Sequence, residues 1–176
     1  MQRGVPGRQI AAREIRARIW SNEALDEDSA NDDRRMAAAL DPTNARWQID
    51  LGYALATAQH YWAAKRAFDR ALAIAESWGA LAGRAAVNYS LHDVRAAYAD
   101  ARRSVLLQDN APAYIVLGDL ASDRKDPGYA GAYWLEAYRL GERSVDLLVR
   151  LQGAGIGDPD KEVERRELGG GPPVKI

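Results

Sequence analysis

The chain has 176 residues, of which 47% are hydrophobic and 28% are charged, and its formal net charge is −1. That length suits one domain with a buried core, and the near-neutral, evenly mixed charge argues against nucleic acid as the main partner. The lack of cysteine excludes disulfides, thiolate metal sites and a cysteine nucleophile, and leaves the redox compartment open.

The two ends of the chain are predicted to be flexible tails. Residues 1–9 contain two glycines and a proline, and residues 169–176 read GGGPPVKI, which cannot continue a helix. No apolar run approaches the roughly 20 residues of a membrane span, and the basic N-terminus lacks the apolar core of a secretory signal. We therefore expect a cytoplasmic protein if the chain is complete, while a periplasmic location stays open if a signal was removed.

Between the tails the sequence predicts helices and almost no strand. Ile10, Ile15 and Ile19 mark a first helix, and Asp41–Pro42 ends a second one because the residue before a proline is pushed out of the helical region. Further helices are predicted, in chain order, at about 45–58, 61–76, 79–90, 93–107, from Pro112, from Pro127 to before Gly141, at 144–152 and at 158–168.

A period of about 33 residues, a length typical of helical repeats, links these helices. Leu51–Gly52 recurs two periods later as Leu117–Gly118. Three further series keep the same step, namely Ala64, Ala97 and Ala130, then Phe68, Ala101 and Trp134, then Ala71, Ser104 and Ala137. We interpret the small residues as the places where helices press together, with Phe68 and Trp134 filling the remaining gaps.

The spacing resembles the tetratricopeptide repeat family, whose unit of about 34 residues is an antiparallel pair of helices, A and B. The unit at about 45–77 matches best, through Trp47, Leu51, Gly52, Ala64, Phe68, Ala71 and Leu72. The unit at 111–143 keeps Leu-Gly, the unit at 78–110 has Arg84–Ala85 there instead, and a degenerate unit at 10–44 ends in LDPTN. The resemblance implies an all-α fold, a right-handed α-solenoid of antiparallel helix pairs over 10–143 with capping helices over 144–168.

No residue pattern predicts catalysis, a cofactor or a metal. His60 and His92 fall in turns and lack further ligands at matching spacing, so we expect solvated turn residues. The acids between Asp26 and Asp33 do not have the spacing of a calcium loop and suit a helix start. The arginines at 13, 16 and 18 are expected on a solvated helix face, and no phosphate-binding or dinucleotide motif is present. We therefore expect a protein that is not an enzyme.

A binding face follows from the resemblance, because the family grips a peptide or protein segment in a concave groove lined by its A helices. Carried over to this sequence, that face consists of Arg46, Ile49, Tyr53, Ala82, Ala86, Tyr89, Ile115, Asp119, Ser122 and Asp123. The Lys and Asn clamp of the chaperone-binding members is absent, since Ile49, Ala82 and Ile115 occupy its positions. We expect an apolar groove with an acidic patch toward its C-terminal end.

Two roles stay open at this point. The favoured one is a protein-interaction scaffold that binds a partner segment in the groove. The alternative is a structural or oligomeric slice of a larger assembly, such as a bacterial secretion or exopolysaccharide-export machine, which includes a homo-oligomer. Trp62 and Trp78 are expected in the core, and would mark a contact surface if they were exposed.

Overall fold

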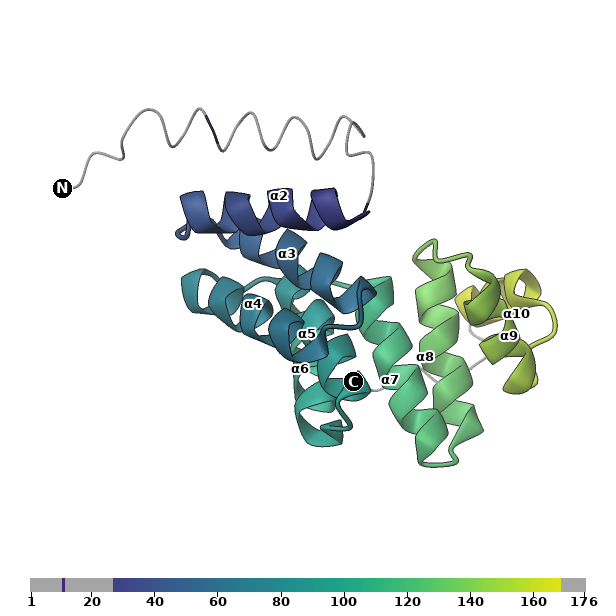
Figure 1. Ribbon diagram of the computed structural model, residues 1–176. Coiled ribbons are helices and arrows are strands. Elements are labelled where there is room, and N and C mark those ends of the chain that lie inside the picture. The colour runs from purple at the N-terminus through teal and green to yellow at the C-terminus, as the bar shows by residue number, and fades with distance from the viewer. Residues whose placement is uncertain (1–10, 12–26, 169–176) are drawn as a thin grey trace.

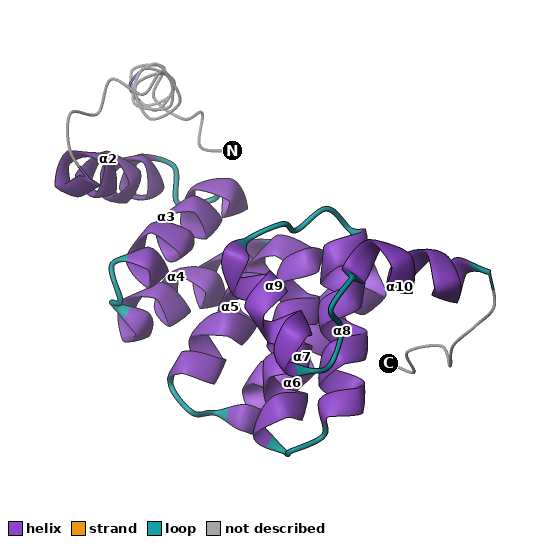
Figure 2. Ribbon diagram, turned by 90° about the vertical axis from the view of Figure 1, so that its right-hand side faces the viewer, coloured by secondary structure: helices purple, strands orange, loops and turns teal. Residues whose placement is uncertain are grey.

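The computed structural model describes residue 11 and residues 27–168, of which 27–31 are described by backbone alone. Within that part of the chain there are helices and no strands (Figure 2). The helices are α2 (Glu27–Leu40), α3 (Ala45–Thr57), α4 (Tyr61–Ile74), α5 (Trp78–Ser90), α6 (Val94–Leu107), α7 (Ala111–Asp123), α8 (Pro127–Arg139), α9 (Val145–Gly153) and α10 (Pro159–Glu167). The predicted tails and the predicted first helix lie outside the described residues.

Polar side chains fix where most of these helices begin. The oxygen of an Asn, Ser or Asp side chain accepts a hydrogen bond from a backbone N–H of the first turn, which would otherwise lack a partner. These caps are Asn44, Ser77, Asp93, Asn110, Asp126, Ser144 and Asp158. The predicted helix starts are confirmed with only small shifts along the chain. The predicted end of α4 at residue 76 is wrong, because Ala75 already takes extended backbone angles of −153° and 135° and the helix ends at Ile74.

The helices form antiparallel pairs, α3 with α4, α5 with α6 and α7 with α8, and the pairs stack in chain order (Figure 1). Each pair turns at the same place, since Gln59, His92 and Lys125 follow one another at one repeat period and all have a φ near 60°. α2 packs on α3 at one end, and α9 and α10 pack on α8 at the other. The predicted all-α solenoid is confirmed.

Glycine and aromatic residues meet where helices cross, as predicted. A Cβ atom built on Gly52 would lie 2.7 Å from Cε1 of Phe68, and one on Gly118 would lie 2.3 Å from Nε1 of Trp134. Gly83 also contacts Phe68, because its Cβ would lie 2.4 Å from Cζ of that ring. These close approaches leave no room for a side chain, so the glycines set the distance between helices.

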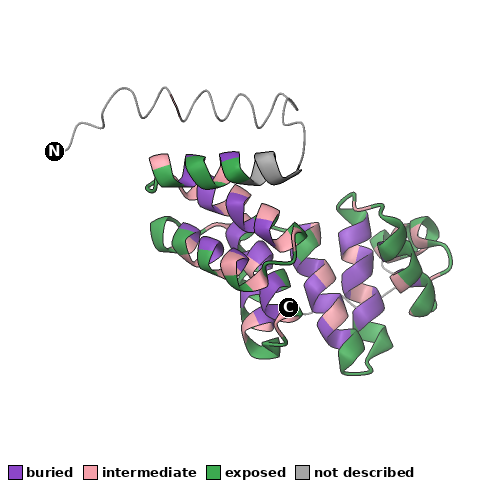
Figure 3. Cartoon of the chain, viewed as in Figure 1, coloured by how far each residue is buried: buried purple, intermediate pink, exposed green. Residues whose placement is uncertain are grey.

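Two buried clusters make up the core, and α5 contributes to both (Figure 3). Ala80 and Val87 of α5 belong to the cluster formed with α2, α3 and α4, whereas Ala82 and Ala85 belong to the cluster that continues to α9. Helix α5 therefore joins the two halves of the stack.

Candidate functional site

The predicted binding residues lie on helices α3, α5 and α7, which are the A helices of three successive pairs, and we call their shared surface the helix-A face. Arg46, Ala86, Ser122 and Asp123 are exposed, Tyr53 is 39% exposed, and Ile49, Tyr89, Ile115 and Asp119 are partly buried. Ala82 is an exception, because it is 0% exposed and lies inside the second cluster. The prediction that Ala82 presents itself to a partner is corrected accordingly: its small side chain permits close helix packing instead.

Tyr53 links two A helices as well as facing solvent. Its hydroxyl donates a hydrogen bond of 2.8 Å to the carbonyl of Gly79 on α5. Its ring stands edge-on to Phe68, with 5.2 Å between centroids and an interplanar angle of 81°. Burial raises the pKa of the Tyr53 hydroxyl, so this group stays a neutral donor. Tyr53 thus stabilises the stack, and only part of its ring is available to a partner.

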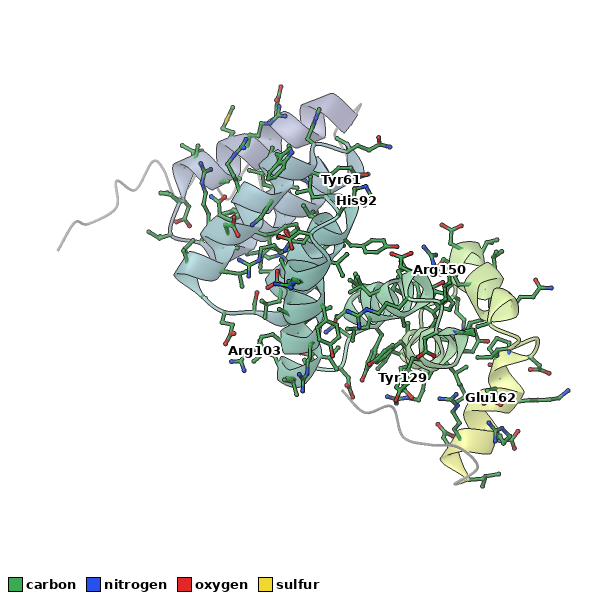
Figure 4. The ribbon with its side chains drawn as sticks, turned by 90° about the horizontal axis from the view of Figure 1, so that it is seen from below. Tyr61, His92, Arg103, Tyr129, Arg150 and Glu162 are labelled. Carbon is green, nitrogen blue, oxygen red and sulfur yellow. The ribbon has the colours of Figure 1, made fainter. Side chains whose placement is uncertain are left out.

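Asp119 is held by two neighbours and is not a free acidic group. Nε1 of Trp134 donates to its Oδ1 at 3.1 Å. Nε of Arg150, a residue labelled in Figure 4, donates to the same oxygen at 3.0 Å. Burial raises the pKa of Asp119, while Arg150 and Trp134 act in the opposite direction. The expected acidic patch is therefore reduced to Asp123, and Arg150 places a cation beside it from α9.

Tyr89 joins α5 to the C-terminal end of the face. Burial raises the pKa of Tyr89 to about 12, and a hydrogen bond to Asp123 on α7 adds to the effect. Because the phenol is neutral over the physiological range, it can act as a donor toward the nearby Asp123 carboxylate. The exposed acid thus lies close to a partly exposed ring.

Three aliphatic residues of α9, the helix that follows the last pair, are exposed and were not predicted. Val145 is 74% exposed, Leu148 is 38% exposed and Val149 is 61% exposed. Leu148 lies one repeat period after Ile115, which itself lies two periods after Ile49, so the period could have found it. It was missed because residues 144–168 were interpreted as capping helices without a repeat pattern.

A polar network occupies the interior of the pair α5 and α6, and it too was not predicted. Arg84 donates through Nη2 to Asp100 at 2.7 Å and through Nη1 to Asp69 of α4 at 2.8 Å. Asn88 donates to the same Asp100 carboxylate at 3.0 Å. The network ties α4, α5 and α6 together. Asn88 and Asp100 are buried, whereas the side chains of Arg84 and Asp69 are 25% and 42% exposed at its rim. Its role is therefore mainly structural.

The described residues contain neither a cluster of metal ligands nor a membrane-spanning helix. In residues 11 and 27–168, no group of three or more His, Asp or Glu side chains could hold a metal ion. The same part of the chain has no helix long and apolar enough to span a bilayer. His60 and His92 are exposed turn residues, as predicted.

A stack of antiparallel helix pairs with one repeat period and glycine–aromatic crossings defines the tetratricopeptide fold, and solved structures share it. The chain is similar to PilF of Pseudomonas aeruginosa, with 18% identity and a TM-score of 0.68 over 95% of this chain and 79% of that one. It is also similar to PilW, described as a type IV pilus biogenesis factor, with 21% identity and a TM-score of 0.64 over 88% and 74% of the two chains.

A third similar structure is YrrB, described as a TPR protein with an unusual peptide-binding site. It has 16% identity and a TM-score of 0.59 over 90% of this chain and 84% of that one. No protein-family model matches the chain, and no curated protein matches it. The resemblance to the tetratricopeptide repeat family is therefore confirmed at the level of the fold.

Proposed function

We propose that this protein is a non-enzymatic scaffold that binds a segment of a partner protein on the concave helix-A face. The observation that carries the proposal is the partly exposed ring of Tyr53 on α3, together with aliphatic side chains that keep at least partial exposure at one repeat position, namely Ile49 on α3, Ile115 on α7 and Leu148 on α9. Aromatic and aliphatic groups that are solvated in the free protein gain free energy when a partner removes them from water.

The polar groups at the C-terminal end of this face suit a basic residue in the partner. Asp123 is exposed and lies close to the neutral hydroxyl of Tyr89, which can donate to its carboxylate. Asp119 is already neutralised by Arg150. The expected ligand is a segment with apolar anchors and one Lys or Arg positioned near Asp123. The peptide-binding site named for the similar YrrB supports a role of this kind.

A peptide-display experiment tests the helix-A face directly. Random peptides selected on the wild-type protein should bind at least about tenfold more weakly to the Ala86→Glu variant, because a charged side chain would stand in the middle of the face. Ala86 is exposed and makes no core contact, so the melting temperature should not change. Ala39→Glu on α2 is the matched control, since Ala39 is exposed and remote from the face. If the selected peptides bind both variants equally well, the binding face is misplaced.

A second role, as one part of a larger assembly, is favoured by α9. Val145 and Val149 are 74% and 61% exposed at the end of the stack, which is a large exposure for aliphatic side chains on a folded helix. The similarity to PilW, a pilus biogenesis factor, fits such a role. Sedimentation velocity over a concentration series should then show self-association that Val149→Glu abolishes. A monomer at every concentration would leave this second role without support.

A further inference from the structure

The basic side chains of α4 and α6 outnumber the acidic ones. These two helices, the B helices of adjacent pairs, carry six basic residues and two acidic ones. Both acids, Asp69 and Asp100, pair with the guanidinium of Arg84 on α5, at 2.8 Å and 2.7 Å. Asp100 is buried, and the Asp69 side chain is 42% exposed but is already paired with Arg84 and Lys65, so the outer sides of α4 and α6 carry an excess of positive charge.

Three arginines on this outer side have no partner among the described residues. Lys65 pairs with Asp69, and Arg103, which projects outward in Figure 4, pairs with Glu76 at 2.8 Å. Arg66, Arg70 and Arg95 are exposed and form no hydrogen bond or ion pair with the side chains described, those of residues 32–168. A guanidinium that lacks an intramolecular carboxylate can offer its planar pair of N–H donors to a carboxylate of another molecule.

Trp62 completes this surface. It is 65% exposed, which makes it the most exposed tryptophan of the described residues, and the prediction that it lies in the core is wrong. Trp62, Arg66 and Arg70 follow one another at four-residue steps, so they form a stripe along α4 with about 6 Å of rise per step. Arg95 stands on α6 at the position that Trp62 holds on α4, one repeat period earlier.

We propose that this outer arginine face, made of Trp62, Arg66, Arg70 and Arg95, binds an acidic segment of a partner protein. The attraction is local, because the formal net charge of the whole chain is −1 and gives no general affinity for anions. Carboxylates on alternate residues of an extended segment lie roughly 6.5–7 Å apart, close to the spacing of Arg66 and Arg70. The exposed ring of Trp62 adds an apolar contact beside the charges.

A chain segment fits this face better than a flat anionic surface does. The stripe of Trp62, Arg66 and Arg70 runs along α4, and Arg95 holds the equivalent place on α6, the B helix of the next pair. A flexible acidic peptide can follow that path from α4 to α6, whereas a planar bilayer touches a convex surface only along its crest. The occupant is therefore assigned as an acidic peptide segment, distinct from the ligand proposed for the helix-A face.

Fluorescence anisotropy with a synthetic peptide of alternating glutamate and serine tests this assignment. The wild-type protein should bind the peptide with an affinity that falls as salt rises, and it should not bind the same peptide with glutamine in place of glutamate. The double variant Arg66→Gln/Arg70→Gln should bind at least about tenfold more weakly, because each lost charge-assisted pair contributes to affinity. Trp62→Ala should also weaken binding, whereas Ala86→Glu on the helix-A face should leave it unchanged.

The matched control is Arg35→Gln/Lys125→Gln, which removes two exposed cations, one on α2 and one in the turn between α7 and α8, and changes the net charge equally. This control should keep wild-type affinity, and both double variants should keep wild-type melting temperatures. Equal weakening by the two double variants would mean that only net charge matters and would overturn the proposal. Vesicles of phosphatidylglycerol and phosphatidylcholine form a separate arm. Binding to these vesicles without binding to the peptide would overturn the assignment of a protein partner.

Discussion

Phe68 shows at the scale of single residues how this chain controls the distance between helices. Its ring is 0% exposed, and it lies between Gly52 of α3 and Gly83 of α5. Tyr53 packs edge-on against the same ring. Because glycine stands on two sides of the ring, α3, α4 and α5 approach one another more closely than larger residues would permit.

The first prediction compares two glycines of the same helix. Gly83→Ala should lower the free energy of unfolding by about 1–3 kcal/mol, because the added methyl group would lie 2.4 Å from a buried ring that has no space to move. Gly79→Ala should be neutral or stabilising by up to about 1 kcal/mol, since no atom lies within 4 Å of its added Cβ and alanine favours a helix. Urea unfolding of the two variants measures both effects. Equal stability of the two variants would contradict the assignment of Gly83 to a tight helix crossing.

The same residues show how far the sequence could predict contacts. Gly52, Gly118 and their aromatic partners follow the repeat spacing, so they were identified from the period alone. Gly83 breaks that spacing, since Asp50 stands one period before it and Val116 one period after it. Its contact with Phe68 comes from the way α5 packs against α4, which no residue pattern along one chain reports.

At the scale of the helix pair, α5 and α6 have polar residues at positions where the preceding pair, α3 and α4, has apolar ones. Arg84, Asn88 and Asp100 stand where the preceding pair has Leu51, Leu55 and Ala67. The sequence revealed the departure at Arg84 but not the partners, because Asp69 and Asp100 lie on other helices. Ion pairs between elements depend on how the helices are placed, and such pairs were therefore found only in the structure.

The second prediction follows from this substitution of polar for apolar residues. Arg84→Leu should destabilise the fold by about 1–3 kcal/mol, because it leaves the largely buried Asp100 carboxylate without its cation. The triple variant Arg84→Leu/Asn88→Leu/Asp100→Ala copies the set of the preceding pair and should recover most of that loss. Chemical unfolding of the single and triple variants measures the difference. A triple variant less stable than the single one would show that the network itself stabilises this pair.

Helix α10 depends on charges more than any other described helix, because none of its residues is buried. Its Glu162 accepts hydrogen bonds from Arg165 at 2.6 Å and from Arg166 at 3.1 Å. The bond to Arg165 is the larger cause that lowers the pKa of Glu162 to about 2 from 4.5. A lowered pKa means that the folded state favours the charged carboxylate.

The third prediction concerns the acid stability of this helix. The contribution of Glu162 should be fully present above pH 4.5 and should be lost as the pH falls from 4.5 toward about 2. The carboxyl carbon of Glu162, followed by NMR, should titrate with a midpoint near 2, and the helical shifts of Val163 should decline over the same window. A midpoint near 4.5 would show that the two arginines do not hold this carboxylate in solution. In Glu162→Gln the decline of the Val163 shifts should be absent from this window.

At the scale of the whole molecule, the fold is a row of helix pairs in which each pair contacts mainly its neighbours. The repeat period predicted this row, and it predicted which helices supply the helix-A face. It could not predict that Arg150 neutralises Asp119, that Ala82 is buried, or that α9 exposes its valines. The features of Arg150 and α9 depend on how the last helices pack against the stack, where the repeat pattern in the sequence is weakest, whereas Ala82 is buried by its place inside the second cluster.

The fourth prediction concerns the local unfolding of the helices in this stack. Helix α5 contacts α3, α4, α6 and α7, and its residues belong to both buried clusters. Exposing its backbone requires disruption of both clusters, whereas α10 has no buried residue of its own and makes few contacts with the stack. Native-state hydrogen exchange should therefore show the slowest amides in α5 and the fastest in α10, with α3 and α8 between them. Gly83→Ala, which disturbs the contact of α5 with Phe68, should speed exchange in α4 and α5 and leave α10 unchanged. If the two clusters instead exchanged at unrelated rates and α5 was no slower than α10, the stack would consist of two independent units and α5 would not join them.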